Sequence, residues 1–191
     1  MSIIKTKLKL SLLFGFLLSN LIFASLQAAE VEEGTLAPDF SIKRLDGSEF
    51  KLSNFRGEKA VHMVFWTTWC TYCMKKIPNL KYNQSVLGKQ IEIIAIDTSV
   101  RDTLAKAYRF QKDREINYPL AFDFGKNVTD LYGVWGTPTE FVIDINGFII
   151  HRDDVPTDIS EHLSNWNMID HRGQQKQLLA EKQCNKEQRT C

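Results

Sequence analysis

The feature that most restricts the fold is a pair of cysteines between a buried strand and a helix. Residues 61–66 form a short apolar run of β-branched and aromatic residues, which predicts a buried strand. The sequence that follows is compatible with a helix to about Leu87, with Cys70 just before that helix or in its first turn. Residues three apart share one face of a helix, so the sulfur atoms of Cys70 and Cys73 can meet across one turn.

The position of Cys70 predicts its chemistry. Free backbone N–H groups and the positive end of the helix dipole converge at the start of a helix, and they favour a thiolate there. Cys70 is therefore the expected nucleophile, and Cys73 is the expected resolving thiol. The predicted reaction is thiol–disulfide exchange through a mixed disulfide.

The redox interpretation is favoured over four other uses of the pair. Half of a zinc site lacks a second nearby CxxC, because Cys184 and Cys191 form a distant C-x6-C. Haem attachment needs a histidine where Met74 stands. A peroxide-reducing thiol needs a proline where Met63 stands, although Thr67 fits the second required position. A purely structural disulfide is the remaining alternative.

The first 28 residues have the pattern of a targeting segment. Lysines at positions 5, 7 and 9 precede an almost wholly apolar run, 10–24, and small residues follow at Ala28-Ala29. The prediction is a signal peptide over residues 1–28, and the alternative is an uncleaved membrane anchor. We therefore expect an exported, periplasmic protein, soluble or tethered to the inner membrane by this segment. Disulfides persist in such an oxidising compartment.

The charge balance gives no support for a nucleic-acid partner. The chain has 24 basic and 23 acidic residues, a formal net charge of +1. Without the three lysines of residues 1–28, 21 basic residues stand against 23 acidic ones, a net charge of about −2. No basic patch stands out along the sequence.

Residues 34–170 are predicted to form one α/β domain, followed by a polar tail over residues 171–191. The dipeptides Asp46-Gly47 and Asn146-Gly147 predict tight hairpins. A second buried strand at 91–97, separated from the first by a helix, implies at least one parallel pair, so the sheet is mixed. We expect further strands at residues 37–42, 49–52, 118–123, 138–144 and 148–151, and further helices at residues 100–113, 127–132 and 158–169.

Some finer expectations concern the ends and the first helix. Residues 30–36 are expected to be a flexible lead-in. Ile77, Leu80 and Val86 are expected to face inward from the helix. The tail cysteines, Cys184 and Cys191, are expected to pair with each other; the alternatives are a second redox pair, a link to another chain, or free thiols.

Three stretches together resemble one family. Trp69-Cys70-Thr71-Tyr72-Cys73 precedes a helix that contains Pro78, residues 136–144 form a Thr-Pro loop and strand, and Ala37-Pro38-Asp39-Phe40 opens a hairpin. This combination resembles the exported TlpA/ResA-like branch of the thioredoxin superfamily over about residues 34–165. The resemblance implies a thioredoxin fold, which is a mixed sheet flanked by helices, with an added N-terminal β-hairpin.

The resemblance also implies roles around the cysteine pair. Pro138 is expected to follow a cis peptide bond and to lie against Cys70 and Cys73. Thr137 is then expected to present its backbone to a substrate chain, as an added strand would require. Trp69 is expected at the surface, where it would belong to an apolar docking area.

Two acidic residues of related proteins are missing from the matching positions. This chain has Val64 where thioredoxins have a buried aspartate, and Ile77 where many ResA-like proteins have a glutamate in the first helix. Glu140 is our candidate proton-handling residue for Cys73, and the alternative is a plain strand residue. His62 is expected to be structural and to face the opposite side of its strand.

The resemblance implies a thiol:disulfide oxidoreductase and favours a reductase of disulfides in exported proteins. Related proteins often act on apocytochromes c before haem attachment, with electrons from a membrane thiol donor. The alternatives are a disulfide oxidase or isomerase of exported proteins and, from a different class, a copper- or zinc-handling binding module. For the oxidoreductase we expect no cofactor and no metal.

Overall fold

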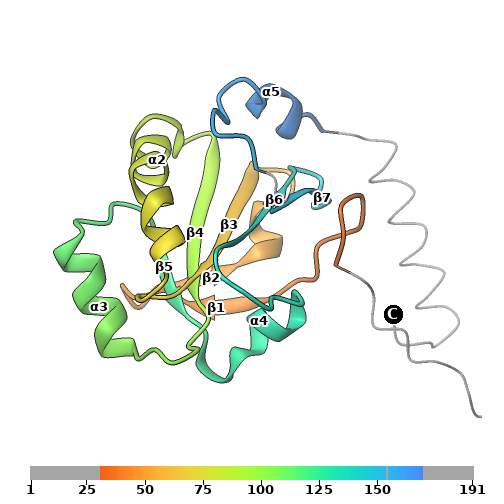
Figure 1. The fold of residues 1–191 in the computed structure, drawn as a ribbon. Coiled ribbons are helices and arrows are strands. Elements are labelled where there is room, and N and C mark those ends of the chain that lie inside the picture. The colour runs from red at the N-terminus through yellow and green to blue at the C-terminus, as the bar shows by residue number, and fades with distance from the viewer. Residues whose placement is uncertain (1–30, 154, 170–191) are drawn as a thin grey trace, which may run out of the picture. The chain divides into compact units, whose positions relative to one another are not determined.

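The central strand, β3, belongs to a five-stranded mixed sheet with the order β5-β4-β3-β6-β7 (Figure 1). β3 (Ala60–Trp66) pairs in parallel with β4 (Ile91–Asp97) and antiparallel with β6 (Thr139–Ile143). Beyond these, β5 (Leu120–Phe122) runs parallel to β4, and β7 (Ile149–Arg152) runs antiparallel to β6. All of β3 is buried, as its mainly apolar sequence predicts for a strand covered on both faces.

The structure is a computed structural model that describes residues 31–153 and 155–169. The predicted signal peptide or anchor at residues 1–28 lies outside these ranges, and so does the tail at residues 171–191 with its two cysteines. Within the described ranges, no helix is both long enough and apolar enough to cross a membrane.

Helices cover both faces of the sheet, which confirms the predicted architecture. α2 (Thr71–Leu87) and α3 (Leu104–Asp113) pack on one face, and α5 (Leu163–Trp166) contributes to the same apolar cluster. α4 (Asn127–Leu131) packs on the other face together with the N-terminal hairpin (Figure 1). Two short 3-10 helices, η1 and η2, span Leu52–Phe55 and Phe124–Lys126.

The N-terminal hairpin is present and docks against the sheet. β1 (Ser41–Lys43) pairs antiparallel with β2 (Glu49–Lys51), and Gly47 in the turn has a φ of 90°, which glycine adopts at little cost. Phe50 of β2 is fully buried in the cluster on the α4 face. Side-chain contacts between the hairpin and β4 reinforce this docking.

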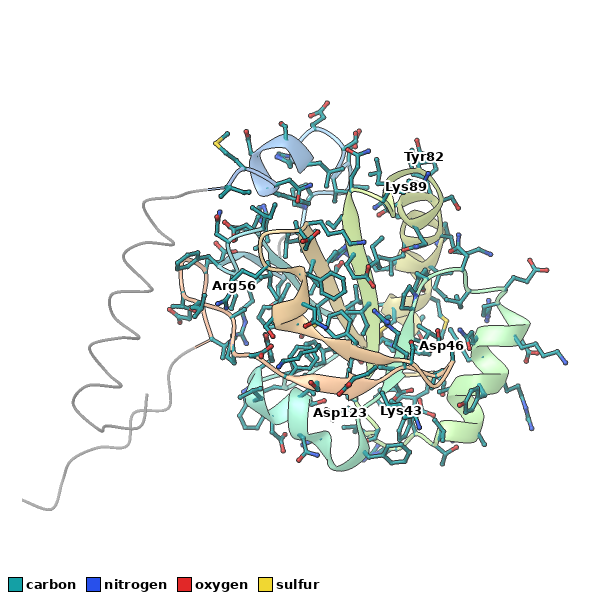
Figure 2. The ribbon with its side chains drawn as sticks, turned by 180° about the vertical axis from the view of Figure 1, so that it is seen from behind. Lys43, Asp46, Arg56, Tyr82, Lys89 and Asp123 are labelled. Carbon is teal, nitrogen blue, oxygen red and sulfur yellow. A yellow bond between two sulfur atoms is a disulfide. The ribbon has the colours of Figure 1, made fainter. Side chains whose placement is uncertain are left out.

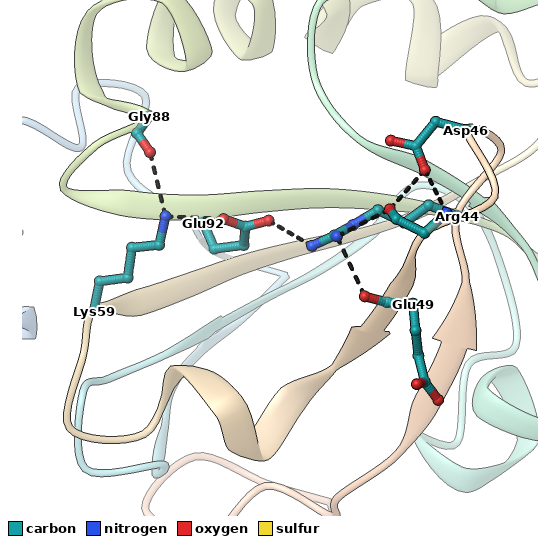
Figure 3. Close-up of polar contacts among 7 residues, drawn as sticks. Arg44, Asp46, Glu49, Lys59, Gly88 and Glu92 are labelled. Atoms are coloured by element: carbon teal, nitrogen blue, oxygen red, sulfur yellow. Dashed lines mark hydrogen bonds and ion pairs between the residues drawn. The ribbon is translucent and has the colours of Figure 1, made fainter.

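The side-chain contacts centre on Glu92 of β4, between two cations (Figure 3). One carboxylate oxygen of Glu92 accepts from Arg44 Nη2 and the other pairs with Lys59 Nζ, each at 2.9 Å. Lys59 also donates to the carbonyl of Gly88, just after α2, at 3.4 Å. The network therefore connects the hairpin, the start of β3 and the turn after α2.

The lead-in is not the free segment that the sequence predicted. The amide of Gly34 donates to the carbonyl of Ile149 at 2.7 Å, and the Ile149 amide donates to the carbonyl of Thr35 at 2.9 Å. Leu36 forms an isolated bridge with Phe148. β7 is the edge of the sheet, so its outward backbone groups need partners, and the lead-in supplies them.

Two helix predictions were also wrong in detail. Val86 is 56% exposed, and the buried positions of α2 include Cys73, Leu80 and Leu87, which recur every seven residues, or two helical turns. The last helix spans only Leu163–Trp166 because residues before it form a turn, in which Asp158 accepts hydrogen bonds from the amide and hydroxyl of Ser160.

Phe50→Ala should lower the free energy of unfolding by about 3–5 kcal/mol, because it removes a buried ring that stacks on Phe55 and contacts Phe40. Urea denaturation measures the change. Tyr82→Ala is the matched control: this ring projects from α2 away from the sheet (Figure 2), so its loss should cost less than about 0.5 kcal/mol. A loss below about 1 kcal/mol for Phe50→Ala would show that the hairpin lies outside the cooperative core.

Candidate active site

The two cysteines form a disulfide across the first turn of α2. The S–S distance is 2.09 Å and the Cα atoms lie 5.2 Å apart. Cys70 is the N-cap residue, with extended backbone, and its Sγ accepts a hydrogen bond from the Cys73 amide at 3.1 Å. Both residues are buried. The predicted strand–CxxC–helix unit is therefore confirmed, with Cys70 immediately before the helix.

The loop before β6 lies beside the cysteine segment, and its Thr137–Pro138 peptide bond is cis, as the resemblance implied. The backbone pairing of Phe65 with Thr139 places the start of β6 next to the end of β3. The Thr139 hydroxyl donates to the Gly136 carbonyl at 3.0 Å and so closes the loop.

An open cavity of about 80 Å³ lies between the two loops, and exposed aromatic rings border it. Trp69 comes from the cysteine segment and Trp135 from the cis-proline loop; they are 53% and 98% exposed. Thr137 also lines this cavity. Trp69 thus lies at the surface as expected, and its indole Nε1 donates to the carbonyl of Val100 at 2.9 Å.

Glu140 belongs to a buried polar cluster on the α2 face of the sheet. Its Oε2 lies 2.9 Å from His62 Nε2, and its Oε1 pairs with Lys76 of α2. His62 therefore faces the same side as the cysteine helix, contrary to the prediction that it points away. Burial alone would raise the pKa of Glu140, but the hydrogen bond and charge of His62, followed by those of Lys76, hold the pKa below its ordinary value.

Lys76 is a site residue that the sequence analysis missed. It stands three residues after Cys73 on α2, and the two side chains line the same small cavity. The available signal was the i, i+3 spacing, which puts Lys76 on the face of the helix that carries Cys73. The sequence could not show its partner, because Glu140 is 64 positions away along the chain.

The segment that leads to Cys70 is held by the loop after β4. The amide of Thr98 donates to the carbonyl of Trp66 at 3.0 Å. The carboxylate of Asp102 accepts from both the amide and the hydroxyl of Thr68, at 2.6 and 2.9 Å. Together with the Trp69–Val100 contact, these bonds hold the segment that precedes Cys70 in place. The sequence analysis missed Asp102 as well.

In the ranges described, no group of three or more His, Cys, Asp or Glu residues is arranged to hold a metal ion. The reactive group of this site is the Cys70–Cys73 disulfide, and its chemistry is thiol–disulfide exchange. A cysteine pair that can open and close at the start of this helix, on this sheet, defines the class of thioredoxin-fold thiol–disulfide oxidoreductases.

Comparison with known proteins agrees with this class. Residues 34–152 match the AhpC/TSA family, and the chain belongs to it. Thiol-disulfide oxidoreductase ResA of Bacillus cereus (strain ATCC 10987 / NRS 248) is 36% identical over 143 residues, which cover 72% of this chain and 78% of that protein. The chain is accordingly a thiol:disulfide oxidoreductase of the ResA-like type.

Solved structures support the fold. A crystal structure of a candidate thiol:disulfide interchange protein DsbE from Chlorobium tepidum is 28% identical, with a TM-score of 0.61 over 71% of this chain and 96% of that one. The exposed lipoprotein thioredoxin Etrx1 of Streptococcus pneumoniae strain TIGR4 is 24% identical, with a TM-score of 0.59 over 67% of this chain and 99% of that one.

Glu140→Gln should lower the free energy of unfolding at pH 7 by roughly 1–3 kcal/mol, because it removes the carboxylate between His62 and Lys76. A lowered folded-state pKa stabilises the fold above the ordinary value of 4.5, and this contribution is lost as the pH falls through the folded-state pKa. The difference between the two proteins should therefore shrink in acid. Urea denaturation at pH 7 and at about pH 3 tests this.

The exposed Glu58→Gln provides the control, for which little change is expected at either pH. A difference for Glu140→Gln that stays constant with pH would contradict the charge interpretation and leave only a packing effect.

Proposed function

We propose that this protein reduces disulfide bonds in exported proteins, with Cys70 as the nucleophile and Cys73 as the resolving thiol. The observation that carries the assignment of the nucleophile is the position of Cys70 at the N-cap of α2, with the Cys73 amide directed at its sulfur. The reductase direction rests on the family resemblance. In the reduced protein that donor and the dipole of α2 would stabilise a thiolate on Cys70.

The proposed reaction follows from the disulfide geometry. The Cys70 thiolate attacks one sulfur of a substrate disulfide, a mixed disulfide forms, and the other substrate sulfur leaves as a thiolate that takes up a proton. Cys73 then loses its proton to solvent and attacks Cys70 Sγ. The second substrate sulfur leaves as a thiolate and takes up a proton, so that two electrons and two protons have passed to the substrate. The product state of the protein is the Cys70–Cys73 disulfide described above.

Cys73 needs help in losing its proton, and we assign this help to Lys76 and Glu140. Lys76 lines the same cavity as Cys73, so its positive charge would favour the Cys73 thiolate. Glu140 holds Lys76 in place from β6. Because Glu140 is itself held ionised, it serves as the anchor and counter-charge of Lys76 in this proposal, and the proton of Cys73 passes to solvent.

Substrate would dock across the cavity between the two loops. Trp69 and Trp135 offer apolar surface to an unfolded or extended chain. The backbone of Thr137, turned by the cis bond to Pro138, would pair with the substrate chain in the manner of an added strand.

The place of action and the electron source rest on the sequence and on the family. Residues 1–28 would direct the protein to the periplasm or tether it to the inner membrane. There, as the resemblance implies, a membrane thiol donor would reduce Cys70–Cys73 again. Apocytochrome c cysteines before haem attachment are the substrate that the resemblance implies.

Cys73→Ser should trap substrate proteins as mixed disulfides on Cys70, because the resolving thiol is gone. The measurement uses the full chain with Cys184 and Cys191 changed to Ser, and non-reducing electrophoresis of cell extracts. The parent should reduce insulin disulfides. Cys70→Ser should neither reduce insulin nor trap substrate proteins. A parent inactive on insulin, together with a Cys73→Ser protein that traps nothing, would refute the proposal.

The equilibrium reduction potential of Cys70–Cys73 decides the direction of the reaction. A value below roughly −220 mV is expected for a reductase that depends on a donor. A value above roughly −150 mV would instead favour an oxidase or isomerase of exported proteins. Restoring Cys184 and Cys191 in a repeat measurement would show whether the tail cysteines exchange electrons with the site.

Trp135→Ala should raise KM for a protein substrate by about 5- to 30-fold, as expected for the loss of one aromatic anchor worth about 1–2 kcal/mol. Reduction of the disulfide by dithiothreitol should be unchanged, since a small thiol needs no docking surface. Tyr82→Ala, an exposed ring on the outer side of α2, is the control and should leave KM unchanged. Equal KM values for Trp135→Ala and the parent would place docking elsewhere.

A further inference from the structure

The carboxyl group of Asp97, at the end of β4, is buried with only one of its two oxygens hydrogen-bonded within the part of the chain that the structure describes. Asp97 is fully buried. Its Oδ1 accepts a hydrogen bond from the Ser99 amide at 2.9 Å, whereas Oδ2 finds no donor among the residues that the structure describes. Burial, followed by the neighbouring charge of Asp102, raises the pKa of Asp97 to about 7. The proposed reaction gives this group no part.

Asp102, the acid that acts on Asp97, has the opposite surroundings. Its two oxygens accept from the amide and hydroxyl of Thr68 and from the amide of Thr103. The oxygens of Asp102 are thus supplied with donors, whereas Oδ2 of Asp97 has none within the described ranges. A hydrogen bond between the two carboxyl groups would require a proton on one of them. The buried Oδ2 of Asp97 is the oxygen that would carry it.

The backbone of the loop that carries Asp102 is constrained, so the loop cannot adjust freely if Asp102 moves. Ser99 and Arg101 have φ values of 59° and 53°, which non-glycine residues adopt only where contacts hold them. The same loop binds Trp66, Thr68 and Trp69 directly, as described above. A displacement of Asp102 would therefore also shift Thr68 and Trp69, the residues immediately before Cys70.

The other neighbours of Asp97 offer no compensating charge. In register with it, β3 presents Trp66 and β5 presents Phe122. On the adjoining helix α3, Lys106 and Arg109 are exposed, as is Arg101 of the loop.

The next acid along the sheet, Asp123, follows β5 and is occupied elsewhere. Its carboxylate accepts hydrogen bonds from Val128 and Thr129 at the start of α4. Asp102 is thus the charged group that acts on Asp97 within the described ranges.

We propose that Asp97 is a positioning residue for Cys70: while protonated it bridges to Asp102 and secures the contacts of Asp102 with Thr68, and when ionised it repels Asp102. Loss of the proton loosens the segment before Cys70 and adds negative charge behind it, so the Cys70 thiolate becomes less favourable. The inference rests on the proposed role of Cys70 as the nucleophile. It makes the reactivity of that thiol depend on an acid outside the CxxC motif.

The test follows the reactivity of Cys70 with pH. The full chain with Cys184 and Cys191 changed to Ser is reduced, and the rate of alkylation of Cys70 by iodoacetamide is measured from about pH 5 to about pH 9, with the modified residue identified by mass spectrometry. The parent should show a second inflection near pH 7, where Asp97 ionises. Asp97→Asn should follow a single thiolate titration and react roughly threefold faster at about pH 8. Asp113→Asn, at the exposed end of α3, should behave as the parent.

A stability measurement separates this role from damage to the fold. An acid with a raised folded-state pKa costs stability once the unfolded form has ionised, so stability falls as the pH rises from about 4 to about 7. Asp97→Asn should lose this dependence, and its Tm relative to the parent should rise over that range. If Asp97→Asn does not fold, Asp102→Asn takes its place: without the like charge, the second inflection should move to lower pH.

Two results would overturn the proposal. One is an identical single titration in the parent and in Asp97→Asn. The other is a 13C signal of the Asp97 carboxyl carbon that titrates near the ordinary aspartate value of 3.8. Alkylation that falls on Cys73 instead of Cys70 would count against the assigned nucleophile, while the carboxyl titration would still report on the acid pair.

Discussion

The hydrogen bond from the Cys73 amide to the Cys70 sulfur depends on an abrupt change from strand to helix. β3 is buried on both faces and cannot shift, so its end fixes where α2 can begin. Cys70 then occupies the N-cap, the one position where a side chain meets the free amides of the first turn. The cis-proline loop can border the same cavity because β6 pairs directly with β3.

Two buried acids flank β3 on the face that carries α2, and their surroundings drive their pKa values apart. Glu140 on β6 has two basic partners, and its pKa is lowered. Asp97 on β4 faces another acid, and its pKa is raised to about 7. At neutral pH Glu140 therefore carries a fixed charge, whereas the pKa of Asp97 lies close to that pH. A difference of this kind is how one fold separates a permanent electrostatic group from a titrating one.

Local patterns in the sequence were enough to predict most of the fold. The apolar runs gave β3 and β4, the Asp-Gly and Asn-Gly turns gave both hairpins, and the CxxC spacing gave the disulfide. The pairings that were missed depend on partners that are distant along the chain. The lead-in pairs with β7, and Lys76 meets Glu140, only because the strand order brings them together. Periodicity reports which side of an element is buried, but it carries no information on what lies opposite.

The charged groups near the disulfide differ from those that the resemblance implies for related proteins. Val64 and Ile77 leave β3 and α2 without a carboxyl group there, and α2 instead carries the cation of Lys76. In the proposed function, a cation in the cavity of Cys73 would stabilise the thiolate directly, whereas a buried carboxylate in its place would repel the thiolate. The side chain of Lys76 is 41% exposed, and its ammonium group pairs with the buried carboxylate of Glu140 on β6. In the proposed function this ion pair takes the place of a lone acid, because Lys76 lines the same cavity as Cys73.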